Sequence, residues 1–417
     1  LGLVGSEMCI RDSLEEDDDK VVIKLPFGTQ TIPRDEVLEL KKEVIKKKPK
    51  IWKGPKKHPK RPKAVVDEMD FPEKTLDLSD AEILELHRQV HKCFERKDYR
   101  KAVELLKKII AAAPKDQVAW YNLACAYSLL NKKREAVRAL CLAVKAGFTD
   151  FMHITHDPDL DNIRKMPGYK RLLKEADKIM RSQADRTLEE LKKQFGETYA
   201  YAIDENRRLI LATNRSMEVL ERLKKYLYKL ADAEWADFFE HRPLYYISVV
   251  CPSQADFRKI VPNPAIGGFY NPRNKILICG NIGYVLTHEF THAMHFADQH
   301  ARMQQHPIWV CEGYATLMEH SDVAGGHCLP WRINERFKMI QIALRMGRTI
   351  PWRQFMRLSQ PQYMRMASLC YAQGRYVFLY LWETKMLRRW YDEYVAHFKE
   401  DRFGIKAMEK VFGKSLE

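Results

Sequence analysis

The stretch Leu286–His300, "LTHEFTHAMHFADQH", carries four of the chain's 14 histidines. The first two, His288 and His292, are four residues apart, so on a helix they project from one face about one turn apart. Both imidazoles can then reach one metal ion, and Glu289 stands beside them as a carboxylate able to take a proton from water. Chance supplies only about 0.06 such spacings in a chain of this composition. The stretch therefore predicts a metal-binding helix.

The same helix offers two further ligands, and neither fits a straight helix. His295 shares the face but lies roughly 10 Å from His288 along the axis, beyond the combined reach of two imidazoles. Asp298 occupies the third-ligand position of a metzincin-like spacing, HExxHxxGxxH, but His295 replaces the Gly that bends such a helix. Asp298 remains an alternative ligand, and we expect His295, His300 and His306 to occupy a helix flank and a polar loop.

A second stretch, "HPIWVCEGYATLMEH", offers a better third ligand in Glu312, with 19 residues between it and His292. Pro307 suits the first turn of a helix, and the small Gly313 permits close packing against a neighbouring helix. Two adjacent helices can then present His288, His292 and Glu312 to one ion. A catalytic zinc site needs three such protein ligands and one position left open.

These residues resemble the pattern of the gluzincins, the thermolysin-like or peptidase MA-like metallopeptidases. The resemblance covers roughly residues 200–400 and includes "WVCEGYA" around Glu312, "SVVCPSQADFRKI" (248–260) and "GGFYNPRNKILI" (267–278). It implies a Zn²⁺ ion held by His288, His292 and Glu312, with Glu289 as the general base that activates water. The sequence departs from the thermolysin pattern at Thr316, where an Asp would orient a metal histidine.

A later stretch, "LCYAQGRYVFLYLWE" (369–383), provides a donor for the oxyanion. Gluzincins often use a Tyr or His from a later helix, and the resemblance implies that Tyr371 fills this role. His327 is a second candidate. The alternative for Tyr371 is a purely packing role, in an aromatic stripe with Tyr376 and Tyr380.

An internal repeat precedes this region. Ala102 and Ala136 are 34 residues apart, inside the matching blocks "DYRKAVELLKKII" and "KKREAVRALCLAV", and residues 120–143 match tetratricopeptide spacing. Each helical hairpin of such a repeat buries its apolar face only against a neighbour. The resemblance implies either a protein-binding groove or a helical spacer. Cys125 and Cys141 stand at apolar helix positions, which predicts buried thiols rather than disulfides.

The net charge of +15 is concentrated in one segment. Residues 41–63 hold 11 Lys and 1 Arg against 1 Glu, and the rest of the chain carries only about +4. We expect this segment to be a solvated tether or an arm that contacts anionic lipid or nucleic acid. No run approaches 18 apolar residues, so no transmembrane segment is predicted.

Strands alternating with single helices, then mostly helix, predict an α+β fold: tetratricopeptide-like hairpins followed by a zincin-type domain. The chain starts at Leu1 with "LGLVGSEMCIRDS", which resembles a translated sequencing artefact, so no compartment is assigned. The expected parts are a doubtful leader (1–19), a β-hairpin segment (20–40), a basic Pro-rich linker (41–79), the repeat domain (80–182) and the metallopeptidase-like domain (185–417).

The sequence thus predicts a zinc-dependent peptidase with a protein-interaction module and a peptide or protein substrate. One rival is a catalytically silent scaffold, in which the repeats bind partners and the zinc domain is a rigid platform. A second rival is a nucleic-acid-associated protein. It depends on residues 41–63 alone, without a basic aromatic sheet or recognition helix to accompany them.

Overall fold

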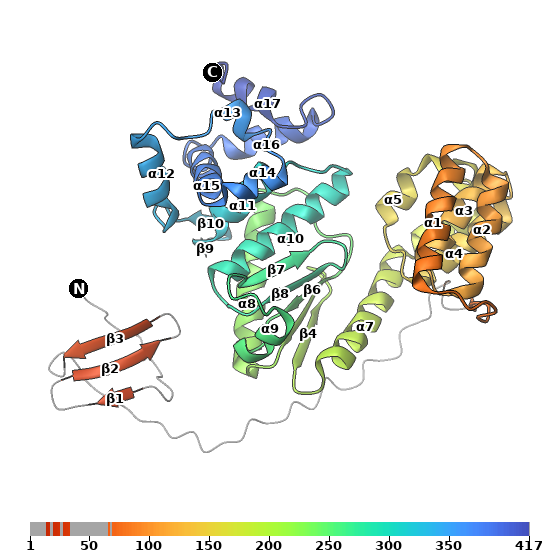
Figure 1. Cartoon of the computed structure of the whole chain (residues 1–417), viewed down its shortest axis with the longest axis horizontal. Helices are drawn as coiled ribbons and strands as arrows, with labels where there is room; N and C mark the ends of the chain where they lie inside the picture. The colour runs from red at the N-terminus through yellow and green to blue at the C-terminus, as the bar shows by residue number, and fades with distance from the viewer. Residues whose placement is uncertain (1–13, 17–19, 26–27, 34–65, 67–68, 417) are drawn as a thin grey trace. The chain divides into compact units, whose positions relative to one another are not determined.

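The structure is a computed structural model that describes residues 14–16, 20–25, 28–33, 66 and 69–416. The chain divides into two compact units, Leu1–Trp52 and Lys53–Glu417 (Figure 1). Each is described by itself. The basic segment 41–63 lies outside the described residues, as do residues 1–13.

The first unit contains a small antiparallel sheet of order β1-β2-β3. Strands β2 (Lys20–Leu25) and β3 (Gly28–Pro33) form the hairpin that the alternating apolar residues predict, with Leu25 opposite Gly28. Strand β1 (Leu14–Glu16) pairs with β2 and lies within the segment that we assigned to a doubtful leader.

The second unit begins with two helical hairpins. Helices α1 (Asp80–Glu95) and α2 (Tyr99–Ala112) form the first, and α3 (Gln117–Leu129) and α4 (Lys133–Ala146) form the second. Ala102 and Ala136, the repeat-defining residues, are completely buried. Small side chains at these positions let the paired helices approach closely, so the tetratricopeptide-like packing predicted from the 34-residue period is confirmed.

The repeat core also settles the two cysteine predictions. Cys125 and Cys141 are free thiols buried in the second hairpin, as expected. After the second hairpin the repeat domain continues through η3 (Pro158–Ile163), α6 (Pro167–Lys174) and the first part of α7 (Ala176–Phe195). A short α5 (Phe151–His156) precedes them. Because α7 continues to Phe195, one helix runs through the boundary that we placed at 182–185.

A five-stranded mixed sheet follows, in the order β4-β5-β6-β8-β7. The central strand β6 pairs in parallel with β5 and β8, while β4 and β7 run antiparallel at the edges. Ser216 caps α8 by accepting a hydrogen bond from the backbone N–H of Val219. The elements are β4 (Ala200–Asp204), β5 (Leu209–Thr213), α8 (Met217–Asp237), β6 (Ile247–Val250), α9 (Gln254–Ile260), β7 (Gly268–Asn271) and β8 (Ile276–Cys279).

The rest of the chain is mostly helical. Helix α10 (Tyr284–Arg302) contacts β7, β8 and α11 (Ile308–Met318), and only the hairpin β9 (Ser321–Ala324) and β10 (His327–Pro330) interrupts the helices. The later helices are α12 (Arg336–Arg345), α13 (Trp352–Phe355), α14 (Gln360–Arg365), α15 (Ala367–Glu383), α16 (Leu387–Ala396) and α17 (Ile405–Phe412).

Gly313 has a different packing partner from the one expected. A Cβ atom at this position would lie 2.1 Å from the Phe378 ring, so the missing side chain lets α11 pack closely against α15. Gly374 of α15 lies opposite, and a Cβ atom built on it would lie 4.0 Å from the Cα of Gly313. The close contact therefore places α15, the helix that carries Tyr371, beside the helix that carries Glu312.

The predicted mixed α+β architecture agrees with this arrangement of helical hairpins, sheet and later helices. Among the described residues, no helix combines the length and apolar character needed to cross a bilayer.

Candidate metal centre

His288, His292 and Glu312 converge on one point. The Nε2 atoms of the two histidines lie 3.1 Å apart, and they lie 3.3 Å and 3.4 Å from Oε2 of Glu312. One ligand atom from each side chain falls within 4.8 Å of the others. The spacing of four places both histidines on one face of α10, and α11 brings the carboxylate from a contacting helix. The structure thus brings together the three residues predicted as metal ligands.

The electrostatics of this group are dominated by burial and opposite charges. Burial raises the pKa of Glu312, but the charges of His292 and His288 outweigh it and hold the pKa well below the ordinary range. Burial likewise lowers the pKa of His288, yet Glu312 and Glu319 together raise it to about 10. The carboxylates of Glu312 and Glu319 therefore favour a positive charge between the side chains of this group.

Glu319, which the sequence analysis missed, orients His288. Its Oε1 atom lies 2.9 Å from Nδ1 of His288, so the other ring nitrogen, Nε2, faces the convergence point. Arg336 from α12 donates to both oxygens of Glu319, at 2.5 Å and 2.7 Å. Burial raises the pKa of Glu319, but bonds from His288 and Arg336 lower it to about 2, so it stays ionised.

Thr316, where the thermolysin pattern has Asp, has no such role. Its buried hydroxyl donates to the Glu312 carbonyl at 2.6 Å. Glu319 lies seven residues after Glu312, which is two helical turns and the same helix face. This spacing was the available signal for the orienting carboxylate.

Glu289 is fixed by the sheet. Its Oε2 atom accepts a hydrogen bond from the backbone N–H of Tyr270 at 2.9 Å. Tyr270 belongs to the edge strand β7, so this N–H points away from the ladder with β8. The contact holds the predicted general base beside the two histidines.

Tyr371 lies beside the group formed by His288, His292 and Glu312, whereas the alternative candidate His327 has another partner. The Tyr371 ring is 6.4 Å from the His288 ring, edge to face, and the Arg336 guanidinium lies 4.9 Å from the Tyr371 centroid. His327 instead bonds Asp237 of α8 at 2.7 Å.

The aromatic stripe considered for the tyrosines of α15 does not form. Tyr376 packs on Phe337, and Tyr380 on Phe412, whereas Tyr371 contacts Tyr363 and His288. The geometry therefore places Tyr371, and not His327, beside the ring of His288.

The prediction for His295 and His306 was wrong. Both are buried, with Nε2 of His295 2.9 Å from Nδ1 of His306, and Phe239 stacks on the His295 ring at 5.2 Å. Burial lowers the pKa of His306 to about 3 and takes that of His295 well below its ordinary value. A histidine in the loop after α10 can fold back onto the helix, and the apolar surroundings keep the pair neutral.

Asp298 and His300 of α10 both have partners outside the group formed by His288, His292 and Glu312. Asp298 is completely buried and accepts bonds from His241, Arg302 and Tyr391, at 2.9 Å, 2.8 Å and 2.6 Å. These hydrogen bonds occupy both oxygens of the Asp298 carboxylate. The geometry therefore gives no support to the alternative of Asp298 as a metal ligand. His300 lies 2.8 Å from Asp150.

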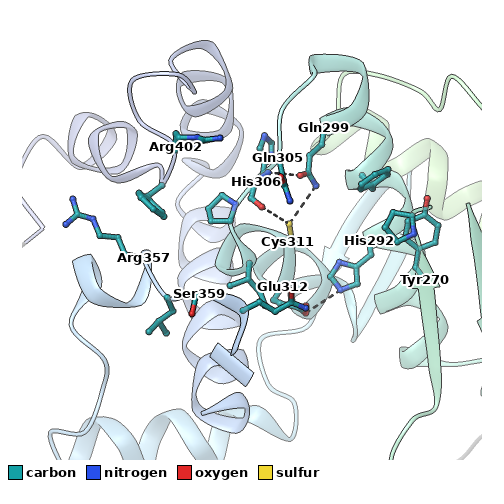
Figure 2. A pocket seen from close by; sticks show the side chains of 17 residues that line it. Tyr270, His292, Gln299, Gln305, His306, Cys311, Glu312, Arg357, Ser359 and Arg402 are labelled. Carbon is teal, nitrogen blue, oxygen red and sulfur yellow. Dashed lines mark hydrogen bonds and ion pairs between the residues drawn. The ribbon is translucent and has the colours of Figure 1, made fainter. Parts of the chain in front are cut away.

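A cleft of about 620 Å³ opens beside the group, and His292, Glu312 and Tyr270 line it. Figure 2 shows His292 and Glu312 pointing toward one another, with Arg357 and Ser359 on the opposite side. This volume is within the usual range for ligand sites. The convergent side chains are therefore accessible to a substrate.

Comparison with known proteins identifies part of the chain. Residues 94–149 match the tetratricopeptide repeat family. A chloroplastic protein from Arabidopsis thaliana is 39% identical over 82 residues, which cover 19% of this chain and 24% of that protein. The chain thus spans about a quarter of the length of this curated relative. The comparison with solved structures gives no significant match. These findings show that the chain carries a tetratricopeptide-type repeat module.

Proposed function

We propose that this protein is a zinc-dependent peptidase that carries a tetratricopeptide-type module for binding protein partners. The observation that supports it most is the triangle of donor atoms from His288, His292 and Glu312, with sides of 3.1, 3.3 and 3.4 Å. Ligands about 2.0–2.1 Å from a tetrahedral zinc ion stand about 3.3–3.4 Å apart. The triangle therefore has nearly the size of one face of a zinc tetrahedron.

The chemistry of the donors supports the same assignment. Oε2 of Glu312 is buried and accepts no hydrogen bond from the described residues, although two imidazole nitrogens face it. A single proton could form a hydrogen bond between only two of the three donor atoms, whereas a divalent cation can bind all three of them. Two imidazoles and one carboxylate are a common ligand set of catalytic zinc. Zinc bound there supplies a Lewis acid that polarises a carbonyl group and acidifies water.

Glu289 would act as the general base. It follows His288 directly on α10, and the Tyr270 N–H keeps one of its oxygens in place. From there the carboxylate takes a proton from the attacking water and passes it to the leaving amine. Positioned general bases contribute about 10²–10⁴-fold to the rate.

Tyr371 would donate a hydrogen bond to the developing oxyanion. Its hydroxyl contacts only a weak acceptor among the described residues, the sulfur of Met364 at 3.7 Å, so the proton is free for a substrate oxygen. Burial raises the pKa of Tyr371, which keeps the phenol protonated at neutral pH. A preorganised donor of this kind stabilises the transition state more than the ground state.

The substitution Glu289→Gln tests the assignment. The purified variant should keep about one zinc per chain, as measured by plasma mass spectrometry, because Glu289 is not a ligand. Its hydrolysis of a peptide library should fall by at least about 10²-fold. Glu221→Gln, on the exposed face of α8, is the matched control and should behave like the parent. Full activity in Glu289→Gln would rule out this mechanism.

One observation favours a second candidate, a catalytically silent scaffold. The repeat match at residues 94–149 is sufficient for partner binding without any chemistry elsewhere. A protein that contains zinc but cleaves no member of the peptide library would support this candidate.

A further inference from the structure

The outward face of α12 is apolar and basic. Ile340 and Ala343 face the core, whereas Met339, Ile342 and Met346 are 39%, 42% and 54% exposed. Their spacing of three and four residues places these three on one side of the helix. Helix α12 thus has apolar residues on two sides. Packing against the core accounts for Ile340 and Ala343 but not for the three exposed apolar residues.

Two basic side chains flank this outer row. Lys338 and Arg345 precede and follow Ile342 by four and three residues, so they lie on the same exposed side. We call Lys338, Met339, Ile342, Arg345 and Met346 the α12 face. The connection leading into the helix adds two more exposed apolar residues, Trp331 and Ile333, at 49% and 65%.

The surrounding sequence carries charge of one sign. Residues 336–382 contain eight Lys or Arg and no Asp or Glu. Arg336 and Arg353 of this stretch are paired with Glu319 and Glu409. By contrast, Lys338 and Arg345 form no ion pair with any residue that the structure describes. Their charges are therefore available to an external anion.

We propose that the α12 face docks on the surface of an anionic lipid bilayer. Helices that lie in a membrane interface combine cationic side chains, which attract acidic headgroups, with apolar side chains that insert beside them. Exposed Met and Ile side chains suit acyl chains, whereas single-stranded nucleic acid uses several aromatic side chains on which successive bases stack, and this face has only Trp331 beside it. An acidic polypeptide would match the charge but gives less reason for exposed Met339, Ile342 and Met346. The proposal does not depend on the metal site.

Hydrogen–deuterium exchange of the full chain can locate the contact. Vesicles of phosphatidylcholine mixed with phosphatidylglycerol should slow exchange in peptides that span residues 331–348, and pure phosphatidylcholine vesicles should not. This local readout is needed because residues 41–63, with a charge of +11, can bind the same vesicles. The triple variant Met339→Ser/Ile342→Ser/Met346→Ser should lose the protection and keep its fold, since all three side chains are exposed.

Charge reversal separates this face from general basicity. Lys338→Glu/Arg345→Glu should weaken the local contact at least about twenty-five-fold, about five-fold for each charge. Lys107→Glu/Lys108→Glu, on exposed positions of α2, changes the total charge equally and should leave the protection intact. Unchanged exchange in 331–348 with anionic vesicles would overturn the proposal, as would protection that survives in both α12 variants. Equal protection by soluble polyglutamate would overturn it in favour of an acidic protein partner.

Discussion

Helix α10 places histidines in two opposite environments. In its first half, His288 and His292 face Glu312, and Glu319 holds the far nitrogen of His288. In its second half, His295 is packed against His306 and stacked on Phe239, without a carboxylate bonded to its ring. The same residue type on one helix thus has its pKa raised to about 10 at His288 and lowered well below the ordinary value at His295.

The difference shows that burial alone does not set the charge state of a histidine on this helix. Burial lowers the pKa of His288 in the first pair, as it does for His295 and His306 in the second. Carboxylates that face one pair from α11 favour a cation there, while rings around the other pair favour neutral imidazole. Metal binding should therefore discriminate sharply between the two pairs.

The largest effect should come from replacing one histidine of each pair. His292→Phe removes one of the three proposed zinc ligands and should weaken zinc binding at least about a thousand-fold, so the isolated protein should contain almost none. His295→Phe should retain about one zinc per chain, because its ring faces His306. Plasma mass spectrometry on folded, desalted protein provides the measurement. Equal zinc content in the two variants would show that the two histidine pairs do not differ in metal binding.

A smaller effect is expected for the residue that faces the first pair from α15. Tyr371→Phe removes one hydroxyl and should lower kcat by about 10²–10³-fold with little change in KM and none in zinc content. Tyr380→Phe, on the exposed side of the same helix, is the control and should match the parent. A rise in KM with unchanged kcat would instead assign Tyr371 to substrate binding.

The histidine spacing and the repeat period could be read from sequence because both are regular spacings along the chain. His288 and His292 are one turn apart, and Ala102 and Ala136 mark one repeat. Glu312 was expected near the two histidines because Pro307 and Gly313 indicate a second helix that can pack closely, and the resemblance to gluzincins implies a third ligand there. Local periodicity and ligand count are sufficient for such predictions.

The environment of each side chain was not predictable in the same way. Arg336 meets Glu319 only after β9 and β10 turn the chain back, and His306 meets His295 only because the loop folds onto α10. Net charge was misleading for a related reason. The run 336–382 has no acidic residue, but acidic residues elsewhere offset its charge in the total. Contacts between distant segments, and the exposed side of α12, require the fold.

The pair of His295 and His306 should make the stability of the protein sensitive to acid. Burial holds the folded-state pKa of His306 at about 3, while an unfolded histidine has a pKa of about 6.5. Between these two pKa values, only the unfolded chain binds a proton at His306. The stabilisation that comes from keeping His306 neutral is therefore fully present above pH 6.5 and is lost as the pH decreases. The loss is about 1.4 kcal/mol per pH unit, or about 3 kcal/mol near pH 4.5.

Urea unfolding of the parent and of His306→Gln at pH 7 and near pH 4.5 measures the loss of stability on acidification that is due to His306. The variant has no titrating group at the position and should lose less stability on acidification, although it starts lower because the bond to His295 is altered. The nearby charges of Asp298 and Arg302 act in opposite directions on His306 and remain in both proteins. Identical acid dependence in the two would show that His306 does not stay neutral.

The smallest effect concerns the carboxylate that distinguishes His288 from His295. Glu319→Gln keeps a hydrogen-bond acceptor for Nδ1 of His288 but removes the charge that holds this nitrogen as a donor, and it weakens the pairing with Arg336. Loss of such an outer partner typically costs about 10–100-fold in metal affinity. Competition with a zinc chelator gives the measurement, and Glu335→Gln, an exposed neighbour, is the control. An unchanged zinc affinity would mean that α10 and α11 alone fix the ring of His288. In that case the two pairs would differ only through Glu312, and the contrast along α10 would depend on a single carboxylate.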